Sequence, residues 1–305
     1  MRSPKITIAK LEAMIQQGRG TGTGNGYTPW ILPTKRGTSS SSNQSYVPMP
    51  MSRRHSFYLS LGERHLAHVY WWLGAADVRE QFPLWPWPHP HPMAEIAPQQ
   101  TWPDHPGMDA VARDADIRVY GYPGLHISYV LTIDLMVTLR GSDDALRLLG
   151  ISCKPQEQFD QARPSSRLRE RLELDRRYCI TANIPHLLVH PEQLPRVLVR
   201  QLEWLAPLAQ RHQIDWLINS DAYQRFVQRL NQYVWSTPAH AAAEIAGERL
   251  GWNRHQIDFA THLAMWRQDV DVDLSTPISM ASPLPGGGRR LRDELRSRLL
   301  GLALC

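Results

Sequence analysis

The spacing of hydrophobic and polar positions predicts a mixture of helices and strands up to about residue 195. Helical spacing covers residues 4–17, 60–74 and 164–180. Strand-like runs cover 117–122, 128–139, 147–154 and 184–190, and the last of these looks buried on both faces. Residues 93–115 have no regular period and predict an irregular excursion. Because a strand, a helix and a strand follow one another from 147 to 190, we expect a parallel crossover and an α/β sheet.

The pattern changes after Pro195, and residues 196–305 predict mostly helices. The stretch "HAAAEIAGERLGWNRHQIDFATHLAMWRQ" indicates two helices joined by a turn at Gly251, and a short strand-like "VDVDL" follows. That order is typical of a helix-turn-helix with a wing, although a plain helical hairpin explains the same two helices. The change in pattern predicts two domains, residues 1–195 and residues 196–305.

Two charges stand inside the apolar run "VLTIDLMVTLRGSDDALRLLGISCKP", where a buried strand should carry none. Alternation puts Asp134 on one face of its strand, with Ile133 and Leu135 on the other, and Ser152 shares a face with Lys154. If the two strands pair through the polar turn between them, the aspartate and the lysine meet. A buried ion pair without further function would explain this. We slightly favour magnesium-dependent phosphodiester cleavage, because it needs a carboxylate for the metal and a cation beside the attacking water.

Two further carboxylates favour the second explanation. On the helix predicted for 164–180, Asp175 falls inside the apolar arc and must find a partner on the sheet, whereas Glu173 falls on the opposite, solvated side. Glu63 borders the apolar face of the helix predicted for 60–74. It also fits a capping box with Ser60 in "SLGE", so a role in capping and a role at a site remain equally open.

Composition adds limits on the class of protein. The chain has 305 residues, 42% of them hydrophobic, and its 34 basic and 29 acidic residues give a net charge of +5. The excess is local, because "RPSSRLRERLELDRR" and "GGGRRLRDELRSRLL" each carry a charge of +3, which suits phosphate groups or a solvated helix face. No apolar run approaches the roughly 20 residues of a membrane helix. The absence of a secretory apolar region and three scattered cysteines indicate a cytoplasmic protein.

The glycine-rich and proline-rich segments could each belong to a different kind of binding site. The glycine-rich "GRGTGTGNGYTPWI" lacks the Gly-Lys-Ser/Thr of a phosphate-binding loop, so we expect it to pack Tyr27 and Trp30 against the domain or a partner and to let its backbone approach DNA. In the proline-rich "REQFPLWPWPHPHPM", His89 and His91 are either metal ligands or, as we favour, surface histidines held between prolines.

Taken together, several stretches resemble the TnsA family, the endonuclease subunit of heteromeric cut-and-paste transposons. The resemblance rests on the glycine-rich stretch, on "LGERHLA…DVREQFPL", on "TIDLMV…ISCKP" and on "ERLELDRRYC", which span roughly residues 18 to 190 with gaps. It implies a restriction-endonuclease-like domain followed by a winged-helix-like domain. It also implies Mg²⁺-dependent cleavage of the non-transferred strand at the transposon's 5′ ends, in partnership with a DDE transposase and an AAA+ ATPase regulator.

The resemblance also assigns roles to residues. It implies that Glu63 and Asp134 are metal-binding carboxylates, that Lys154 is the catalytic lysine, and that Asp175 supports the site. Related nucleases place an acidic residue or glutamine where this chain has Ser152, and a hydroxyl is a weak ligand for Mg²⁺. The backbone carbonyl of Cys153 then becomes the expected additional ligand.

The serine keeps open a second interpretation, a nuclease-inactive adaptor that bridges transposase and ATPase. A stand-alone repair or junction-resolving nuclease of the same fold is a third. For the nuclease, the candidates for contact with the DNA backbone are basic residues of one predicted helix, namely Arg167, Arg169, Arg176 and Arg177. The arginine-rich end of the chain is a further candidate contact for DNA or for the ATPase.

Overall fold

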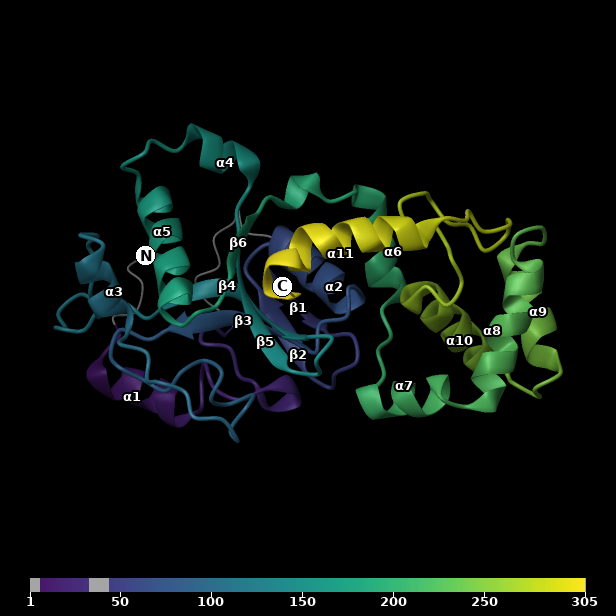
Figure 1. Cartoon of the computed structure of the whole chain (residues 1–305), viewed down its shortest axis with the longest axis horizontal. Coiled ribbons are helices and arrows are strands. Elements are labelled where there is room, and N and C mark those ends of the chain that lie inside the picture. Colours follow the sequence, from purple (N-terminus) through teal and green to yellow (C-terminus); the bar gives the residue numbers. More distant parts are fainter. Residues whose placement is uncertain (1–5, 33–43, 305) are drawn as a thin grey trace.

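The computed structural model of the chain describes residues 6–32 and 44–304. Its centre is a four-stranded sheet in the order β3-β4-β5-β6 (Figure 1). The strands are β3 (Asp77–Leu84), β4 (Leu131–Arg140), β5 (Leu146–Cys153) and β6 (His186–Val189). The first three pair antiparallel, and β6 is parallel to β5. A parallel neighbour requires a crossover, which α4 (Gln156–Gln161) and α5 (Arg167–Thr181) supply.

The two faces of the sheet are covered by different helices because their side chains alternate. On one face, Leu135 and Ile151 share a buried cluster with α2 (Leu61–Trp72). On the other face, Met136 and Leu148 share a second buried cluster with α5. The sheet is therefore the middle layer of three, and polar side chains that lie within it need partners from α2 or α5.

Smaller elements surround this centre. They are α1 (Ile8–Gln16), the antiparallel pair β1 (Ser45–Pro48) and β2 (His55–Tyr58), and α3 (Met108–Asp114). The remaining helices follow β6 in the chain and are α6 (Arg196–Leu205), α7 (Arg211–Ile218), α8 (Asp221–Tyr233), α9 (Ala239–Glu248), α10 (Arg254–Arg267) and α11 (Gly288–Leu304). Within the part of the chain that the structure describes, no helix is long and apolar enough to cross a membrane.

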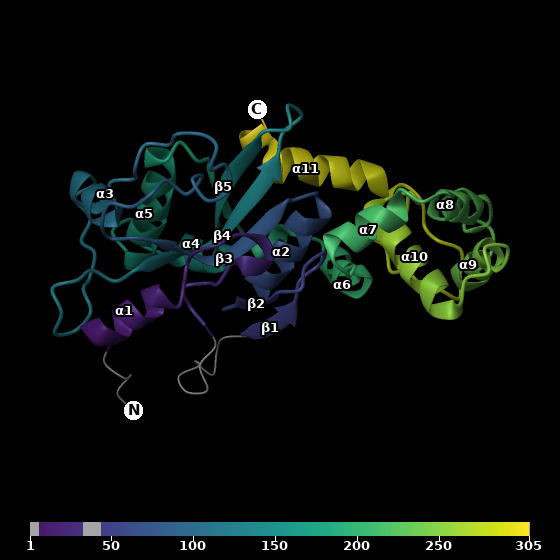
Figure 2. The ribbon, with the colours of Figure 1, turned by 90° about the horizontal axis from the view of Figure 1, so that it is seen from below.

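The last helix returns from the helical end of the molecule to the sheet (Figures 1 and 2). Arg292 donates to the carbonyl of Trp72 at 2.7 Å, and Arg296 donates to the carbonyl of Leu73 at 3.0 Å. These carbonyls stand at the C-terminal end of α2, where a cation is favourable. Two arginines of the basic end of the chain are thus bonded to the end of α2, although Arg292 is only half-buried and Arg296 is exposed.

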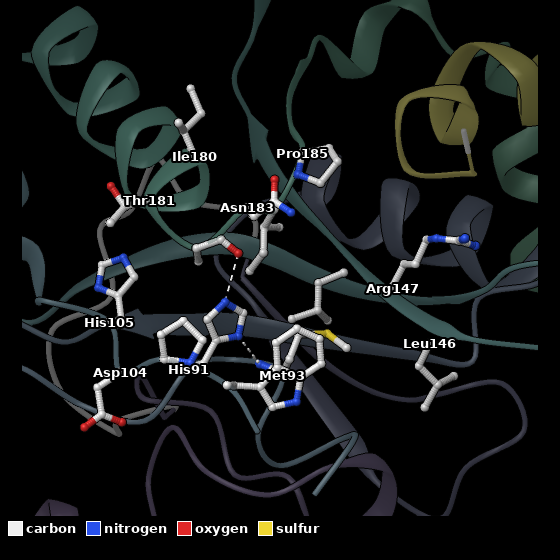
Figure 3. A pocket seen from close by; sticks show the side chains of 15 residues that line it. His91, Met93, Asp104, His105, Leu146, Arg147, Ile180, Thr181, Asn183 and Pro185 are labelled. Atoms are coloured by element: carbon white, nitrogen blue, oxygen red, sulfur yellow. Dashed lines mark hydrogen bonds between the residues drawn. The ribbon is translucent and has the colours of Figure 1, made fainter. Parts of the chain in front are cut away.

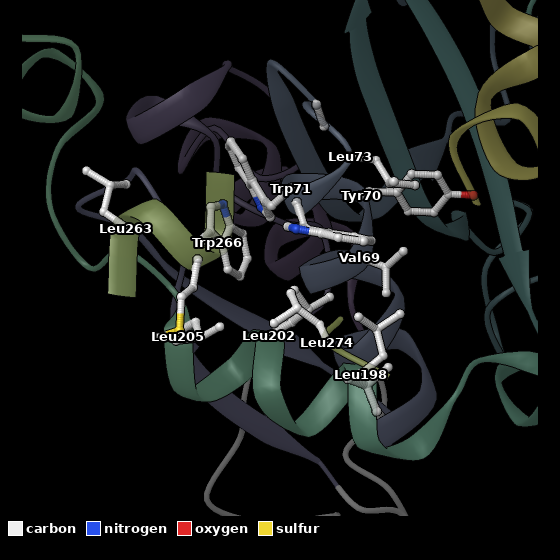
Figure 4. Close-up of a cluster of buried hydrophobic side chains, with 14 of the residues drawn as sticks. Val69, Tyr70, Trp71, Leu73, Leu198, Leu202, Leu205, Leu263, Trp266 and Leu274 are labelled. Carbon is white, nitrogen blue, oxygen red and sulfur yellow. The ribbon is translucent and has the colours of Figure 1, made fainter. Parts of the chain in front are cut away.

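One buried cluster joins the sheet to the C-terminal helices. Trp71 of α2 lies beside Trp266 of α10 and Leu202 of α6, and all three belong to this cluster (Figure 4). Trp266 is almost wholly buried, so this contact removes a large apolar side chain from water. The helices after Pro195 are therefore packed against the part that contains the sheet, and the domain boundary at that residue stays a prediction.

Most elements predicted from spacing are present. The structure confirms the helices at 60–74 and 164–180, the strands at 128–139 and 147–154, the parallel crossover to β6 and the helices after residue 195. The helix predicted for 4–17 is confirmed from Ile8 to Gln16, and residues 4 and 5 lie outside the described part. The chain therefore has the mixed α/β fold that was expected, consistent with a nuclease.

Other expectations were wrong. Residues 117–122 form only one isolated bridge, between Gly121 and Ser128, because this segment folds back on itself as a surface loop. The "VDVDL" segment likewise forms only the bridge between Val272 and Gly286, so a wing is not confirmed. Strand β6 is an edge strand and is mostly half-buried rather than buried on both faces. Strand β3 and helix α3 were missed.

The glycine-rich stretch folds as a tight loop over β3. Tyr27 and Trp30 are both buried in the domain, as expected, and the Tyr27 hydroxyl donates to the carbonyl of Glu80 at 2.9 Å. The N–H groups of Gly22 and Gly24 donate to side-chain carboxylates, at 3.2 Å and 2.7 Å. Backbone donors of this loop are thus already bonded within the chain.

Replacing Gly22 by alanine is expected to lower the free energy of unfolding by about 1–3 kcal/mol. Its φ is +88°, and an added Cβ would lie 2.5 Å from the carbonyl oxygen of Gly26. Gly26→Ala is the matched control, because nothing lies within 4 Å of a Cβ there. Urea unfolding of the two variants checks this, and equal stability would show that the loop tolerates a side chain.

Candidate active site

Asp134 lies where strands β4 and β5 stop pairing. Their paired residues run from Leu135 opposite Ile151 to Arg140 opposite Leu146. Asp134, which directly precedes Leu135, is therefore the first residue of β4 outside this pairing. The carboxylate closes the gap, since its Oδ2 accepts the N–H of Cys153 at 2.7 Å. A strand end of this kind leaves backbone donors for a side chain to bind, and it presents that side chain at the edge of the sheet.

The predicted meeting of aspartate and lysine is confirmed. Lys154 Nζ lies 2.6 Å from Asp134 Oδ2 and 2.9 Å from the carbonyl oxygen of Cys153. The lysine side chain is 25% exposed and the aspartate 12%, so the pair is reachable from solvent. A purely structural ion pair does not need this access, whereas a site that receives a phosphate does.

Glu63 reaches the same place from the other layer. Ser60 caps α2, and its hydroxyl donates to Glu63 Oε1 at 3.0 Å, while Oε2 accepts the N–H of Leu59 at 3.0 Å. The side chain is buried, and this burial together with the nearby charge of Asp134 raises the pKa of Glu63 to about 7. Ser60 is thus the N-cap, whereas the Glu63 side chain reaches the Ser60 hydroxyl and the Leu59 N–H instead of the Ser60 N–H of a capping box. The same bonds place a second carboxylate within electrostatic reach of Asp134.

Gln81 of β3 holds Glu63 in position and was missed by the sequence analysis. Its Nε2 donates to Glu63 Oε2 at 3.0 Å, and its Oε1 accepts the hydroxyl of Thr132 at 2.9 Å. The amide thus links the carboxylate of α2 to strand β4. A signal was present, because Gln81 stands in "DVREQFPL", a motif that the resemblance used without assigning it a role.

The backbone at Gln81 also explains an error in the predicted alternation. Gln81 has a φ of +48° and no partner in the ladder, between the pairs Glu80–Leu135 and Phe82–Ile133. Such an irregularity re-aims the side chains that follow it. Ile133 consequently belongs to the buried cluster on the α5 side together with Phe82, and not to the face of Leu135 as predicted.

Asp175 points from α5 to the sheet, as expected, and has one partner there, Ser152, and one on its own helix, Arg171. Its Oδ1 pairs with Arg171 Nη1, and its Oδ2 accepts the hydroxyl of Ser152 at 3.0 Å. His186 Nε2 lies 3.0 Å from the same hydroxyl. Burial lowers the pKa of His186 to about 4, so the neutral ring donates to Ser152, which donates to Asp175. Ser152 is therefore engaged with α5 rather than directed at Asp134.

Arg171 connects this network to the carboxylate site. Its Nη2 donates to the carbonyl of Thr132 at 2.8 Å, two residues before Asp134. Burial lowers the pKa of Arg171 to about 10, so it still carries its charge at neutral pH. The group formed by Ser152, Asp175 and Arg171 thus fixes the start of β4, and Asp134 with it.

The donor set fits a divalent cation of the magnesium type. Across residues 6–32 and 44–304, no cluster of three or more His, Cys, Asp or Glu side chains could hold a metal by itself. Two carboxylates nevertheless converge, Glu63 and Asp134, and their mutual repulsion favours a cation between them. Mg²⁺ commonly takes one or two carboxylates and completes its shell with water and substrate phosphate.

The four candidate DNA contacts all lie on α5 and all have partners. Arg176 and Arg177 both pair with Glu173, at 2.7 Å and 2.6 Å, and the pKa of that carboxyl falls to about 2 through these bonds. Arg167 pairs with a neighbouring glutamate at 2.7 Å. Arg169 donates to two backbone carbonyls at 2.9 Å and 3.1 Å. Arg169 is thus a structural tether, whereas the other three guanidinium groups remain accessible.

A cavity of about 770 Å³ lies at the opposite end of β5 from Lys154 and is lined in part by Leu146 and Arg147 (Figure 3). Of the two expected surface histidines, His91 lines this cavity and is not a surface group, whereas His89 is half-buried. His91 is buried, donates to a backbone carbonyl at 2.9 Å and accepts an N–H at 3.0 Å. His89 bonds the Tyr178 hydroxyl at 2.7 Å. Both rings hold the proline-rich segment against α5.

Fold and site together define an α/β protein with a carboxylate–lysine centre at the open end of two antiparallel strands. Among known proteins, the chain is similar to the transposon Tn7 transposition protein TnsA of Escherichia coli, with 26% identity over 192 residues. The match covers 63% of this chain and 60% of the relative's length. No family model matches the chain. This similarity agrees with the resemblance that the sequence motifs indicated.

Proposed function

We propose that this chain is a Mg²⁺-dependent DNA endonuclease of a transposition machine. It cuts the non-transferred strand at the 5′ ends of the transposon, together with a DDE transposase that cuts the other strand. The observation that carries the proposal is the contact of Lys154 Nζ with Asp134 Oδ2 at 2.6 Å, at a solvent-reachable strand end beside the buried carboxylate of Glu63. The similarity to a transposition protein supports the biological setting.

Each residue of the site has a role in this reaction. Glu63, Asp134 and the carbonyl of Cys153 would hold the metal, which when bound supplies Lewis-acid stabilisation of charge on the phosphate. Lys154 Nζ donates to the attacking water and to the developing negative charge, while its bonds to Asp134 and to the Cys153 carbonyl fix its position. Gln81 keeps Glu63 aimed at the site.

Supporting residues act through these groups. Asp175 holds Arg171 and Ser152, and Arg171 in turn holds the start of β4. The accessible guanidinium groups of Arg167, Arg176 and Arg177 suit the phosphate backbone of DNA. The mostly helical residues 196–305 would dock an AAA+ ATPase regulator.

Strand cleavage with Lys154→Ala tests the proposal. The substrate is transposon-end DNA labelled on each strand in turn, with Mg²⁺ and the cognate transposase present. We expect the wild type to nick the 5′ end and the variant to be slower by about a hundredfold, because a positioned proton donor is removed. Arg140→Ala is the matched control, since this exposed cation pairs only with Asp144 in the β4–β5 turn.

The adaptor interpretation predicts instead that the wild type does not cut DNA. A wild type that never cuts, but still joins transposase to ATPase, would establish it and reject the nuclease. Equal cleavage by the wild type and the Lys154 variant would show that the lysine and Asp134 form a structural pair only.

A further inference from the structure

A second cavity lies beside the carboxylate site, between α5 and the loop that precedes β4. It has a volume of about 300 Å³. Apolar and aromatic side chains make most of its wall, and two arginines of α5 complete it. The lining residues are Val119, Tyr120, Tyr129, Leu131, Arg167, Arg171 and Leu174.

Tyr120 gives this cavity an aromatic face that is reachable from solvent. Its side chain is 47% exposed. The guanidinium carbon of Arg167 lies 4.3 Å from the ring centroid, and that of Arg118 lies 5.1 Å from it. Cations that stack on an exposed aromatic ring combine the two elements that hold single-stranded nucleic acid, a surface for a base and a charge for its phosphate.

The cavity is close to the proposed cleavage centre. Leu131, in its wall, precedes Asp134 by three residues of the same strand, a separation of about 10 Å. Arg171, also in the wall, donates to the carbonyl of Thr132. Because a stacked strand advances about 3.4 Å per nucleotide, the cavity is about three nucleotides from a phosphate at Asp134.

We propose that this cavity binds one unpaired nucleotide of the DNA strand that is cut. Its base enters the apolar pocket against Tyr120 and Tyr129, and its phosphate lies at Arg167 and Arg118. The nucleotide must be unpaired, because a base inside a duplex has both of its faces covered by neighbouring bases. This inference rests on the proposed function, since it assigns the cavity to the DNA of the same site.

The competing explanation is that the aromatic and basic residues only pack the loop against α5. Arg167 does bond the carbonyl of Arg118 at 3.0 Å and Glu170 at 2.7 Å. Packing alone predicts that loss of the Tyr120 ring leaves DNA binding unchanged, or weakens every DNA equally through misfolding. Binding of a nucleotide predicts an effect on unpaired DNA only.

The test measures binding without cleavage. The probe is a 20-base-pair duplex with a four-nucleotide 5′ overhang that contains 2-aminopurine, and the same duplex with blunt ends is its control. Binding is followed by anisotropy of a fluorescein label in EDTA, and stacking by quenching of the 2-aminopurine. We expect the wild type to quench the probe. Tyr120→Ala should lose the quenching and weaken overhang binding by about tenfold, whereas Tyr120→Phe keeps both.

Two further variants complete the design. Arg167→Ala should weaken overhang binding more than blunt-duplex binding, because it removes a charge from the pocket. Tyr46→Ala, at another exposed tyrosine on β1, should match the wild type. The proposal is overturned if the wild type does not quench, if Tyr120→Ala quenches fully, or if it binds both DNAs equally weakly.

The outcomes separate this proposal from the nuclease itself. The wild type could quench the 2-aminopurine probe and yet never cut DNA in the presence of Mg²⁺ and transposase. That result would support the nucleotide pocket and reject the proposed endonuclease. Cleavage by a Tyr120→Ala variant at the wild-type rate and with wild-type overhang affinity would reject the pocket alone.

Discussion

Replacement of Asp134 by alanine is expected to lower the rate of strand cleavage by about a thousandfold or more, equivalent to at least about 4 kcal/mol of transition-state stabilisation. Two losses combine in this variant. A bound metal would lose one of its two proposed carboxylate ligands, and Lys154 loses the partner that holds its Nζ at 2.6 Å. DNA binding should persist, because removal of a negative charge from the site does not oppose a polyanion.

The same variant should also bind metal more weakly. Titration with Mn²⁺, followed by its electron paramagnetic resonance signal, measures this without any turnover. Asp160→Ala is a matched control on α4, because that carboxylate is exposed and accepts only a bond from Gln156. Wild-type cleavage and wild-type Mn²⁺ affinity in the Asp134 variant would contradict the assignment of this site.

The central pair was predictable because its signal is local. A charge in the middle of an apolar strand must be paired, and alternation places Asp134 and Lys154 on related positions of adjacent strands. The helical period placed Asp175 toward the sheet in the same way, and the structure confirms its burial. Each inference needed only the regular period of a strand or helix and one charged residue at a position where that period predicts an apolar one.

The rest of the site depends on contacts between distant segments. Gln81 stands in a strand whose residues are all buried, so alternation gives no strand signal there. The position of Ser152 beside Asp175 depends on how α5 packs on the sheet. The docking of α11 on the end of α2 joins residues more than 200 positions apart, and spacing within a helix carries no information on it.

Glu63 illustrates a choice that the sequence could not make, because a place at the helix start and a role at the proposed site do not exclude each other. The capping geometry was readable from "SLGE", and the structure has Ser60 as the N-cap. The capping bonds also orient the carboxylate, and its approach to Asp134 requires β4 and α2 to meet. A helix start thus serves to place a buried carboxylate at the site.

Replacement of Asp175 by alanine is expected to lower the free energy of unfolding by about 3 kcal/mol, the lower end of the effect of breaking a buried ion pair, because Asp175 is buried but the Arg171 side chain is 24% exposed. Arg171 would then keep, among the described residues, only its bond to the carbonyl of Thr132. The hydroxyl of Ser152 would lose its acceptor as well. Urea unfolding followed by tryptophan fluorescence measures the change.

A matched control stands two positions earlier on the same helix. Glu173→Ala removes an ion pair with Arg176 and Arg177, but these groups are at the surface, so the expected loss is below about 1 kcal/mol. A double variant, Asp175→Ala with Arg171→Met, should recover part of the stability, because no buried charge is then left unpaired. If the double variant is as unstable as the single one, the cost lies in the lost bond to Ser152 and not in the charge of Arg171.

Strand cleavage by the double variant tests a separate point, because this variant lacks the bond from Arg171 to β4. Its cleavage rate shows whether that bond is needed to hold Asp134 in place.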